Sequence, residues 1–354
     1  MGTFSSLSNG MYNAVPTGSM ESSNIVFTGN RQVELRREEV PDCPPDGLVA
    51  RSLVSLISTG TECICYRGEM DQGTHWADWV RYPFYPGYSN VARVEKVGVE
   101  VEGFEVGDRI FSNSNHRQHI AVKPPLVKIP AEISDEEAAF SKLATITQTG
   151  VRRAHVNMGV KAAVIGLGPL GQLLTQYLRV MGAEEVLAID TVRSRLDIAL
   201  AHGATQTFAG NAAGALPFVK EHTEGRLADV VFDATGRYAV FPLALKLVRR
   251  FGTLMLIGDS PHPSKQVLQD DLITRQITVR GSLDEHLPAD QGEWTQARQI
   301  QLFYKYLAYK GMRVADLITA RHSPAEAPQV YARLLTDRED TLGVIFDWSL
   351  LKET

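Results

Sequence analysis

The residues with the clearest chemical meaning are the glycines of Gly166-Leu-Gly168-Pro-Leu-Gly171, which follow an apolar run and open an amphipathic segment. Gly166 permits a tight turn, Gly168 lets the backbone approach a pyrophosphate, and Gly171 lets a helix pack closely on a strand. Pro169 and Leu170 begin that helix, whose free N–H groups and positive dipole end favour phosphate oxygens. The spacing therefore predicts a dinucleotide-binding turn.

A second apolar run ends at Asp190, 19 residues after Gly171. A carboxylate at this distance can accept hydrogen bonds from both ribose hydroxyls and repels a 2′-phosphate, which predicts NAD as the cofactor. Arg193 and Arg195 follow at once, and either guanidinium could reach a 2′-phosphate. NADP therefore stays open as the alternative.

Further apolar runs that alternate with helical segments must position this turn. The runs DVVFDATG (229–236) and GTLMLIGD (252–259) are separated by a helical segment, and QITVRG (276–281) follows. Alternation of this kind predicts a parallel sheet with helices on both faces. Thr235 and Gly258 lie near the ends of two of these runs, and we expect both to contact the cofactor.

The first half of the chain has a different pattern. Residues 25–57 alternate apolar and polar, and short strands are predicted at 90–97, 109–112 and 119–122, with turn residues between them. Ser134 and Glu137 form a capping box that opens a helix. The sequence therefore predicts an α/β protein in which a β-rich domain precedes a doubly wound parallel sheet.

Composition excludes several classes of protein. The 354 residues are 44% hydrophobic and 22% charged, with a net charge of −5 and no basic cluster, which disfavours a nucleic-acid partner. No apolar run approaches the ~18 residues of a transmembrane helix. Three cysteines, Cys43, Cys63 and Cys65, fit a reducing compartment, and residues 1–23 lack the pattern of a secretory signal. We expect a disordered tail over 1–23, no membrane partner and a cytoplasmic location.

The order of these parts resembles the medium-chain dehydrogenase/reductase superfamily of alcohol dehydrogenase relatives. The resemblance covers about residues 25–350 and rests on several landmarks in the correct order. These landmarks are Gly107-Asp108-Arg109, Glu136-Glu137-Ala138-Ala139, Val164-Ile165-Gly166-Leu167-Gly168-Pro169-Leu170-Gly171 and Asp233-Ala234-Thr235-Gly236.

The resemblance implies how the chain is divided. It implies a GroES-like β-rich catalytic domain over 24–151 and 287–354, and a Rossmann domain over 152–286. It also implies a homodimer in which residues 276–281 pair as an edge strand.

The zinc-binding motifs of that superfamily are altered here. Thr59-Gly60-Thr61-Glu62 stands where zinc-dependent members have Cys-Gly-Thr-Asp, and Gly87-Tyr88-Ser89 stands where they have Gly-His-Glu. Lys142 occupies the position of the third ligand, and an ammonium cannot bind a cation. No cysteine follows Cys65, so the structural zinc lobe is missing too. The pattern is similar to a zinc-less subgroup that includes bacteriochlorophyllide (hydroxyethyl) dehydrogenases, and we expect no zinc.

Another group must then stabilise the developing oxyanion. Lys142 is the candidate, because its ammonium would project to where the metal was, and Glu62 or Tyr88 could position it or relay a proton. The alternative is that Lys142 and Glu62 form an ion pair that merely fills the vacated space. Thr59 could bind substrate or ribose in place of the lost ligand.

Two further residues are predicted to bind substrate. Ser89 follows Tyr88 in the altered motif, and His286 lies in a loop that relatives place beside the nicotinamide.

The predicted activity is hydride transfer between a nicotinamide cofactor and a small-molecule secondary alcohol or its ketone. The hydrogen-bonding side chains favour a polar or cyclic specialised metabolite. Two alternatives stay open at this point. One is a zinc-free, NADPH-dependent enoyl or quinone reductase, and the other is an NAD-binding protein without catalytic activity.

Overall fold

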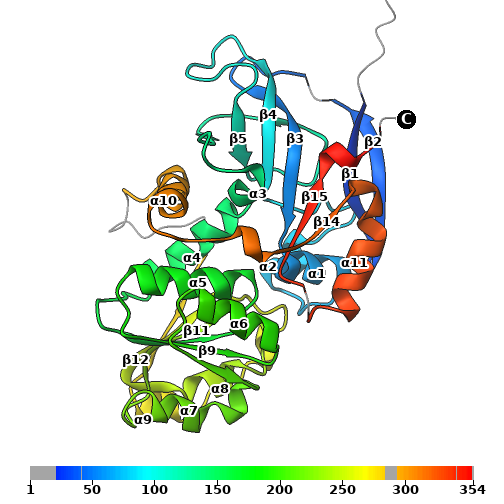
Figure 1. Cartoon of the computed structure of the whole chain (residues 1–354). Helices are drawn as coiled ribbons and strands as arrows, with labels where there is room; N and C mark the ends of the chain where they lie inside the picture. The colour runs from blue at the N-terminus through cyan, green and yellow to red at the C-terminus, as the bar shows by residue number, and fades with distance from the viewer. Residues whose placement is uncertain (1–20, 41, 284–292, 340, 353–354) are drawn as a thin grey trace, which may run out of the picture.

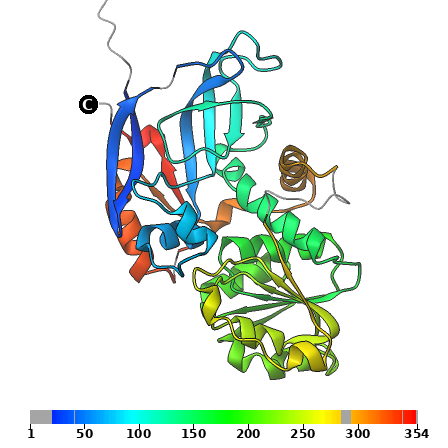
Figure 2. The ribbon, with the colours of Figure 1, turned by 180° about the vertical axis from the view of Figure 1, so that it is seen from behind.

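The computed structural model describes residues 21–40, 42–283, 293–339 and 341–352. These residues form two lobes, one built on antiparallel strands and one on a parallel sheet, with helix α4 (Ser141–Arg153) at their junction (Figure 1). The view from behind shows the same division, with the late segment 293–352 returning to the lobe in which the described chain begins (Figure 2). No helix among these residues is long and apolar enough to cross a membrane.

The parallel lobe contains a six-stranded sheet in the order β10-β9-β8-β11-β12-β13. Its strands are β8 (Lys161–Ile165), β9 (Glu185–Asp190), β10 (Gln206–Ala209), β11 (Ala228–Asp233), β12 (Val248–Leu256) and β13 (Thr278–Gly281). Its helices are α5 (Pro169–Val180), α6 (Arg193–Ala201), α7 (Leu216–Glu221), α8 (Phe241–Leu245) and α9 (Asp271–Thr274). This order confirms the predicted doubly wound sheet.

Alternation along each strand explains why the sheet is covered on both faces. In β8, Ala162 and Val164 pack into one apolar cluster, whereas Ala163 and Ile165 pack into a second cluster. Successive side chains of a strand point to opposite faces, so a continuous apolar run such as β8 must be covered twice.

The β-rich lobe contains a seven-stranded sheet and a separate hairpin. The sheet runs β14-β15-β3-β4-β5-β7, with β6 paired to β3. The sheet strands are β3 (Leu48–Ile57), β4 (Asn90–Val97), β5 (Arg109–Ser112), β6 (His119–Val122), β7 (Val127–Lys128), β14 (Ile318–His322) and β15 (Gly343–Asp347). The hairpin is β1 (Glu21–Gly29) with β2 (Gln32–Glu39), so ordered structure begins inside the range 1–23 that was predicted as a tail.

The helices outside the parallel lobe pack around this sheet and α4. They are α1 (Thr59–Arg67), α2 (His75–Trp79), α3 (Asp135–Ala138), α10 (Gln296–Tyr309) and α11 (Ala327–Thr336). Ser134 and Glu137 form the predicted capping box at α3, which ends after one turn, and α4 follows as a second helix. Cys63 and Cys65 are packed as free thiols in the apolar cluster between α1 and α11.

Candidate active site

The glycine turn has the geometry that its spacing predicted. Gly166 has a φ of +87°, which favours glycine, and a Cβ there would lie 2.7 Å from Thr235 Cγ2. A Cβ on Gly171 would lie 2.0 Å from the Gly166 carbonyl oxygen, so α5 packs directly on the turn. A Cβ on Gly168 would meet nothing within 4 Å, so the backbone is open there. The N-terminus of α5, from Pro169 and Leu170, therefore faces open space that a pyrophosphate can use.

Asp190 supports the turn from the end of β9. One carboxylate oxygen accepts the Leu167 N–H at 2.6 Å and the other accepts the Val192 N–H at 2.8 Å. A carboxylate has about four acceptor positions, so each oxygen can still accept one ribose hydroxyl. Asp190 thus has a structural role that sequence reasoning did not foresee, and its contact with the ribose stays a prediction.

Arg195 does not point its charge at the cofactor site. Its guanidinium donates to the carbonyl oxygens of Arg338 and, at 3.0 Å, Thr341, and so ties α6 to the segment before β15. The prediction that Arg195 contacts the cofactor is therefore not supported. The neighbouring Arg193 is exposed and its Nε lies 3.1 Å from Asp197 Oδ1.

The ends of β11 and β12 complete the cofactor face. Thr235 donates its N–H and its hydroxyl to the same oxygen of Asp233, at 2.9 and 2.6 Å. Gly258 is required by close packing, since a Cβ there would lie 2.3 Å from the Gly236 nitrogen. The chain reverses its direction across the sheet between β8 and β11, and a crevice at such a switch point is where open α/β sheets bind ligands.

Three of the four predicted catalytic residues come together where α1 begins. Thr59 is the first residue of α1 and is buried. The Tyr88 hydroxyl donates to Ser58 Oγ and lies 3.0 Å from Thr61 Oγ1. The Lys142 ammonium lies 5.9 Å from the centre of the Tyr88 ring, within the range of a cation–π interaction. Lys142 is only 6% exposed, so its charge is held in a largely desolvated position.

Glu62 is not part of this group. Its carboxylate accepts hydrogen bonds from the Ser58 N–H at 2.7 Å, from His116 Nε2 at 3.0 Å and from the Tyr331 hydroxyl. The side chain therefore points into the β-rich lobe, and the idea that Lys142 and Glu62 pair is not supported. His116 and Tyr331 are the residues that sequence reasoning missed, because both lie far from Glu62 in the chain.

The two predicted substrate-binding residues have different outcomes. Ser89 is 1% exposed, and its hydroxyl donates to the Ala139 carbonyl oxygen. This bond joins the start of β4 to the end of α3, so the Ser89 side chain does not face a ligand. His286 lies outside the described residues.

Two His–Asp pairs join the two lobes, and neither was foreseen. His75 Nε2, on α2, lies 2.9 Å from Asp259 Oδ2, just after β12. His262 Nδ1 lies 3.0 Å from Asp71 Oδ1. No sequence pattern predicts these pairings, because the partners are far apart in the chain.

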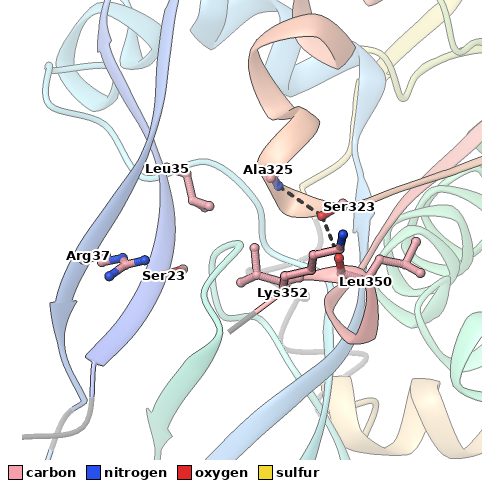
Figure 3. Close-up of a pocket in the computed structure, with 8 residues that line it drawn as sticks. Ser23, Leu35, Arg37, Ser323, Ala325, Leu350 and Lys352 are labelled. Atoms are coloured by element: carbon pink, nitrogen blue, oxygen red, sulfur yellow. Dashed lines mark hydrogen bonds between the residues drawn. The ribbon is translucent and has the colours of Figure 1, made fainter. Parts of the chain in front are cut away.

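The described residues hold no group of three or more His, Cys, Asp or Glu side chains placed for a metal ion. A cavity of about 440 Å³ lies elsewhere, between the β1–β2 hairpin and residues 323–325 and 350–352. Figure 3 shows Leu35 and Arg37 on one side of it and Ser323 and Lys352 on the other. None of its lining residues belongs to the predicted site.

Comparison with known proteins finds relatives among dehydrogenases. The family model for zinc-binding dehydrogenases matches residues 169–300. The chain is 26% identical over 304 residues to the probable D-xylulose reductase A of Neosartorya fischeri, covering 75% of this chain and 83% of that protein.

Solved structures share the fold. A Sinorhizobium meliloti protein described as a zinc-binding dehydrogenase and solved with NADP has a TM-score of 0.79 at 19% identity, over 93% of this chain and 99% of that one. Galactitol-1-phosphate dehydrogenase from Escherichia coli has a TM-score of 0.77 at 18% identity, over 93% and 100%.

The fold, the glycine turn and these matches support a place in the medium-chain dehydrogenase/reductase family. They support, in particular, an NAD(P)-dependent oxidoreductase.

Proposed function

We propose that this protein is a zinc-independent, NAD-preferring dehydrogenase that acts on a polar secondary alcohol or the corresponding ketone. The observation that carries the proposal is the placement of Lys142 over the ring of Tyr88, beside the first residues of α1. Relatives named for a sugar alcohol and for butanediol make an alcohol the favoured substrate class.

The donor set argues against a catalytic zinc. Thr59, Tyr88 and Lys142 supply two hydroxyls and an ammonium, whereas zinc sites use thiolate, imidazole and carboxylate. The nearest carboxylate in the altered motif, Glu62, already accepts three hydrogen bonds inside the β-rich lobe. The residues at these positions therefore do not fit the metal.

The cofactor fits the other lobe. The open backbone at Gly168 and the N-terminus of α5 would hold the pyrophosphate, and Asp190 would hold the ribose. A bound nicotinamide would supply the hydride acceptor or donor. Asp190 favours NAD over NADP, and so does Arg195, whose guanidinium bonds to the Arg338 and Thr341 carbonyls and not towards the ribose.

Lys142 supplies the electrostatic part of the reaction. In ketone reduction, Lys142 Nζ donates a hydrogen bond to the carbonyl oxygen and then its proton to the developing alkoxide. Alcohol oxidation is the reverse of this step, in which the hydroxyl proton passes to Nζ as the hydride leaves the alcohol carbon. Tyr88 faces the ammonium with its ring and fixes its own hydroxyl on Ser58 and Thr61, so it orients Lys142.

The test combines cofactor, metal and turnover. Metal-stripped protein is titrated with NADH and NADPH, untreated protein is analysed for zinc, and both are assayed on polyols, hydroxy acids and cyclic alcohols. We expect tighter NADH binding, no stoichiometric zinc, and alcohol oxidation that Lys142→Met reduces by a factor of about 10²–10⁴ without weakening NADH binding. NADPH-dependent reduction of enones or quinones would instead identify the reductase, and nucleotide binding without turnover would identify a non-catalytic protein.

A further inference from the structure

His116 is a fully buried histidine beside Glu62, in the loop between β5 and β6. Its Nε2 lies 3.0 Å from Glu62 Oε2, and its Nδ1 lies 2.8 Å from Ser55 Oγ. Trp348 Nε1 donates to the same Ser55 oxygen at 3.0 Å. Because indole only donates, the assignment that satisfies every group has the Ser55 hydroxyl donating to Nδ1 and Nε2–H donating to Glu62.

Glu62 connects His116 to Ser58, the residue before α1. Its other oxygen accepts the Ser58 N–H at 2.7 Å, so the carboxylate joins His116 to Ser58. Tyr331 donates its hydroxyl to the carboxylate as well. Burial and the Glu62 charge raise the pKa of Tyr331 well above its ordinary value, so this hydroxyl stays protonated and remains a donor.

His116 also packs against Gly87, the residue before Tyr88. Gly87 has a φ of +94°, and a Cβ there would lie 2.7 Å from His116 Cδ2. The imidazole therefore fills the space beside the residue that precedes Tyr88. At its far end, the Tyr88 hydroxyl donates to Ser58. The contacts form a closed ring that runs from His116 through Glu62, Ser58, Tyr88 and Gly87 back to His116.

We propose that His116 is a positioning residue of this site, which fixes both ends of Tyr88 and thereby holds the Tyr88 ring against the Lys142 ammonium. This inference rests on the proposed function only for its effect on turnover. The geometry itself is a property of the protein without any ligand. The ring also explains why Glu62 is buried without contacting Lys142: its charge positions Ser58, which accepts the Tyr88 hydroxyl.

The test measures the position of the Lys142 side chain relative to the Tyr88 ring. Protein labelled with ¹³C at lysine Cε is compared by NMR, with the Lys142 signal assigned by Lys142→Arg. Protons that lie over an aromatic ring are shifted upfield, so Tyr88→Leu should move the signal downfield. We expect His116→Ala to move it in the same direction, and His116→Gln, which keeps a donor for Glu62, to move it less.

Two further variants make the experiment decisive. Ser55→Ala removes the partner of His116 Nδ1 and leaves the imidazole in place, so it should give the same direction of shift even if His116→Ala does not fold. His202→Ala is the matched control, because His202 is a buried histidine bonded to Asp316 at 2.8 Å in the parallel lobe. We expect no change of the Lys142 signal in that variant. An unchanged signal in folded His116→Ala or Ser55→Ala would overturn the proposal.

Kinetics then separate this inference from the proposed function. If the protein oxidises alcohols, His116→Ala should lower kcat by about tenfold or more while the Kd for NADH stays within about twofold. The double variant of His116→Ala with Tyr88→Phe should lower kcat little further, because the effects of residues that act as one unit are not additive. Shifted NMR signals in a protein without turnover would refute the dehydrogenase and leave the positioning role intact.

Discussion

Asp71 and His262 join the two lobes, with Asp71 Oδ1 3.0 Å from His262 Nδ1. The other oxygen of Asp71 accepts the Ser264 N–H at 3.0 Å, and the Asp71 N–H donates to the Pro261 carbonyl at 2.9 Å. Asp71 therefore fixes residues 261–264, in the loop after β12, to the β-rich lobe.

This contact predicts an acid-sensitive interface. Hydrogen bonds from Ser264 and His262 lower the pKa of Asp71 to about 2. A depressed carboxyl pKa stabilises the folded state above the ordinary value of about 4 and loses this effect as pH falls towards 2. We expect Asp71→Ala to lower the melting temperature by a constant amount from pH 5 to 7. The difference from wild type should shrink below about pH 4. A difference that is unchanged at pH 3 would contradict the role of the charge.

Asp233 predicts the opposite pH dependence. Burial raises the pKa of this carboxyl, which is 2% exposed, to about 6. Ionisation then costs the folded state stability as pH rises from about 4 to 6, by an order of about 3 kcal/mol. Asp233→Asn keeps an acceptor for Thr235 and removes that cost. Thermal unfolding should show the variant more stable than wild type at pH 8 and the two converging at pH 4, and a variant less stable at pH 8 would refute this account.

Two glycines of the turn, Gly168 and Gly171, should give different phenotypes. Gly168→Ala places its methyl in open space at an ordinary φ of −65°, so stability should stay within about 0.5 kcal/mol of wild type. NADH binding should weaken by about tenfold or more, because the methyl enters the space for the pyrophosphate. Gly171→Ala should instead destabilise the fold, since its Cβ would lie 2.0 Å from the Gly166 oxygen. Calorimetry and NADH titration measure the two effects, and equal phenotypes would contradict the assigned roles.

Arg195 and Asp190 should differ in their effect on cofactor choice. Arg195→Ala removes donors to the Arg338 and Thr341 carbonyls and should lower thermal stability while the ratio of NADH to NADPH affinity stays constant. Asp190→Ala should weaken NADH binding and shift that ratio towards NADPH, because the repelling carboxylate is gone. If Arg195→Ala selectively weakens NADPH, the guanidinium reaches the 2′-phosphate after all.

The exposed edge of the parallel sheet predicts a dimer. β13 lies at the end of the sheet order, and the apolar side chains of Phe251, Ile273 and Leu283 are exposed in its neighbourhood. We propose that two copies pair through β13. Thr278→Pro removes a backbone donor from this edge, so mass measurement in solution should find a dimer for wild type and a monomer for the variant. A wild-type monomer at micromolar concentration would refute the pairing.

Local patterns predicted most of the fold. The apolar run, the glycine turn and the acid of β8, α5 and β9 follow one another within thirty residues, and strands Asn90–Val97, Arg109–Ser112 and His119–Val122 lie where their alternation placed them. The partners of charged residues were not predictable in this way. Glu62 bonds to Tyr331, 269 residues away, and Arg195 to Thr341, 146 residues away. Such pairs depend on how the lobes close, which no periodicity within a window reveals.

The position of β15 has a consequence for the order of folding during synthesis. β15 lies between β14 and β3, so the sheet of the β-rich lobe is completed by residues translated nearly three hundred positions after β3. Ser55 and Trp348, which are hydrogen-bonded, are 293 positions apart in the chain. The parallel sheet, in contrast, is contiguous from β8 to β13. The parallel lobe can therefore assemble on the ribosome while residues 54–57 of β3 still lack their partner in β15, and until β15 arrives this part of the strand is an open edge.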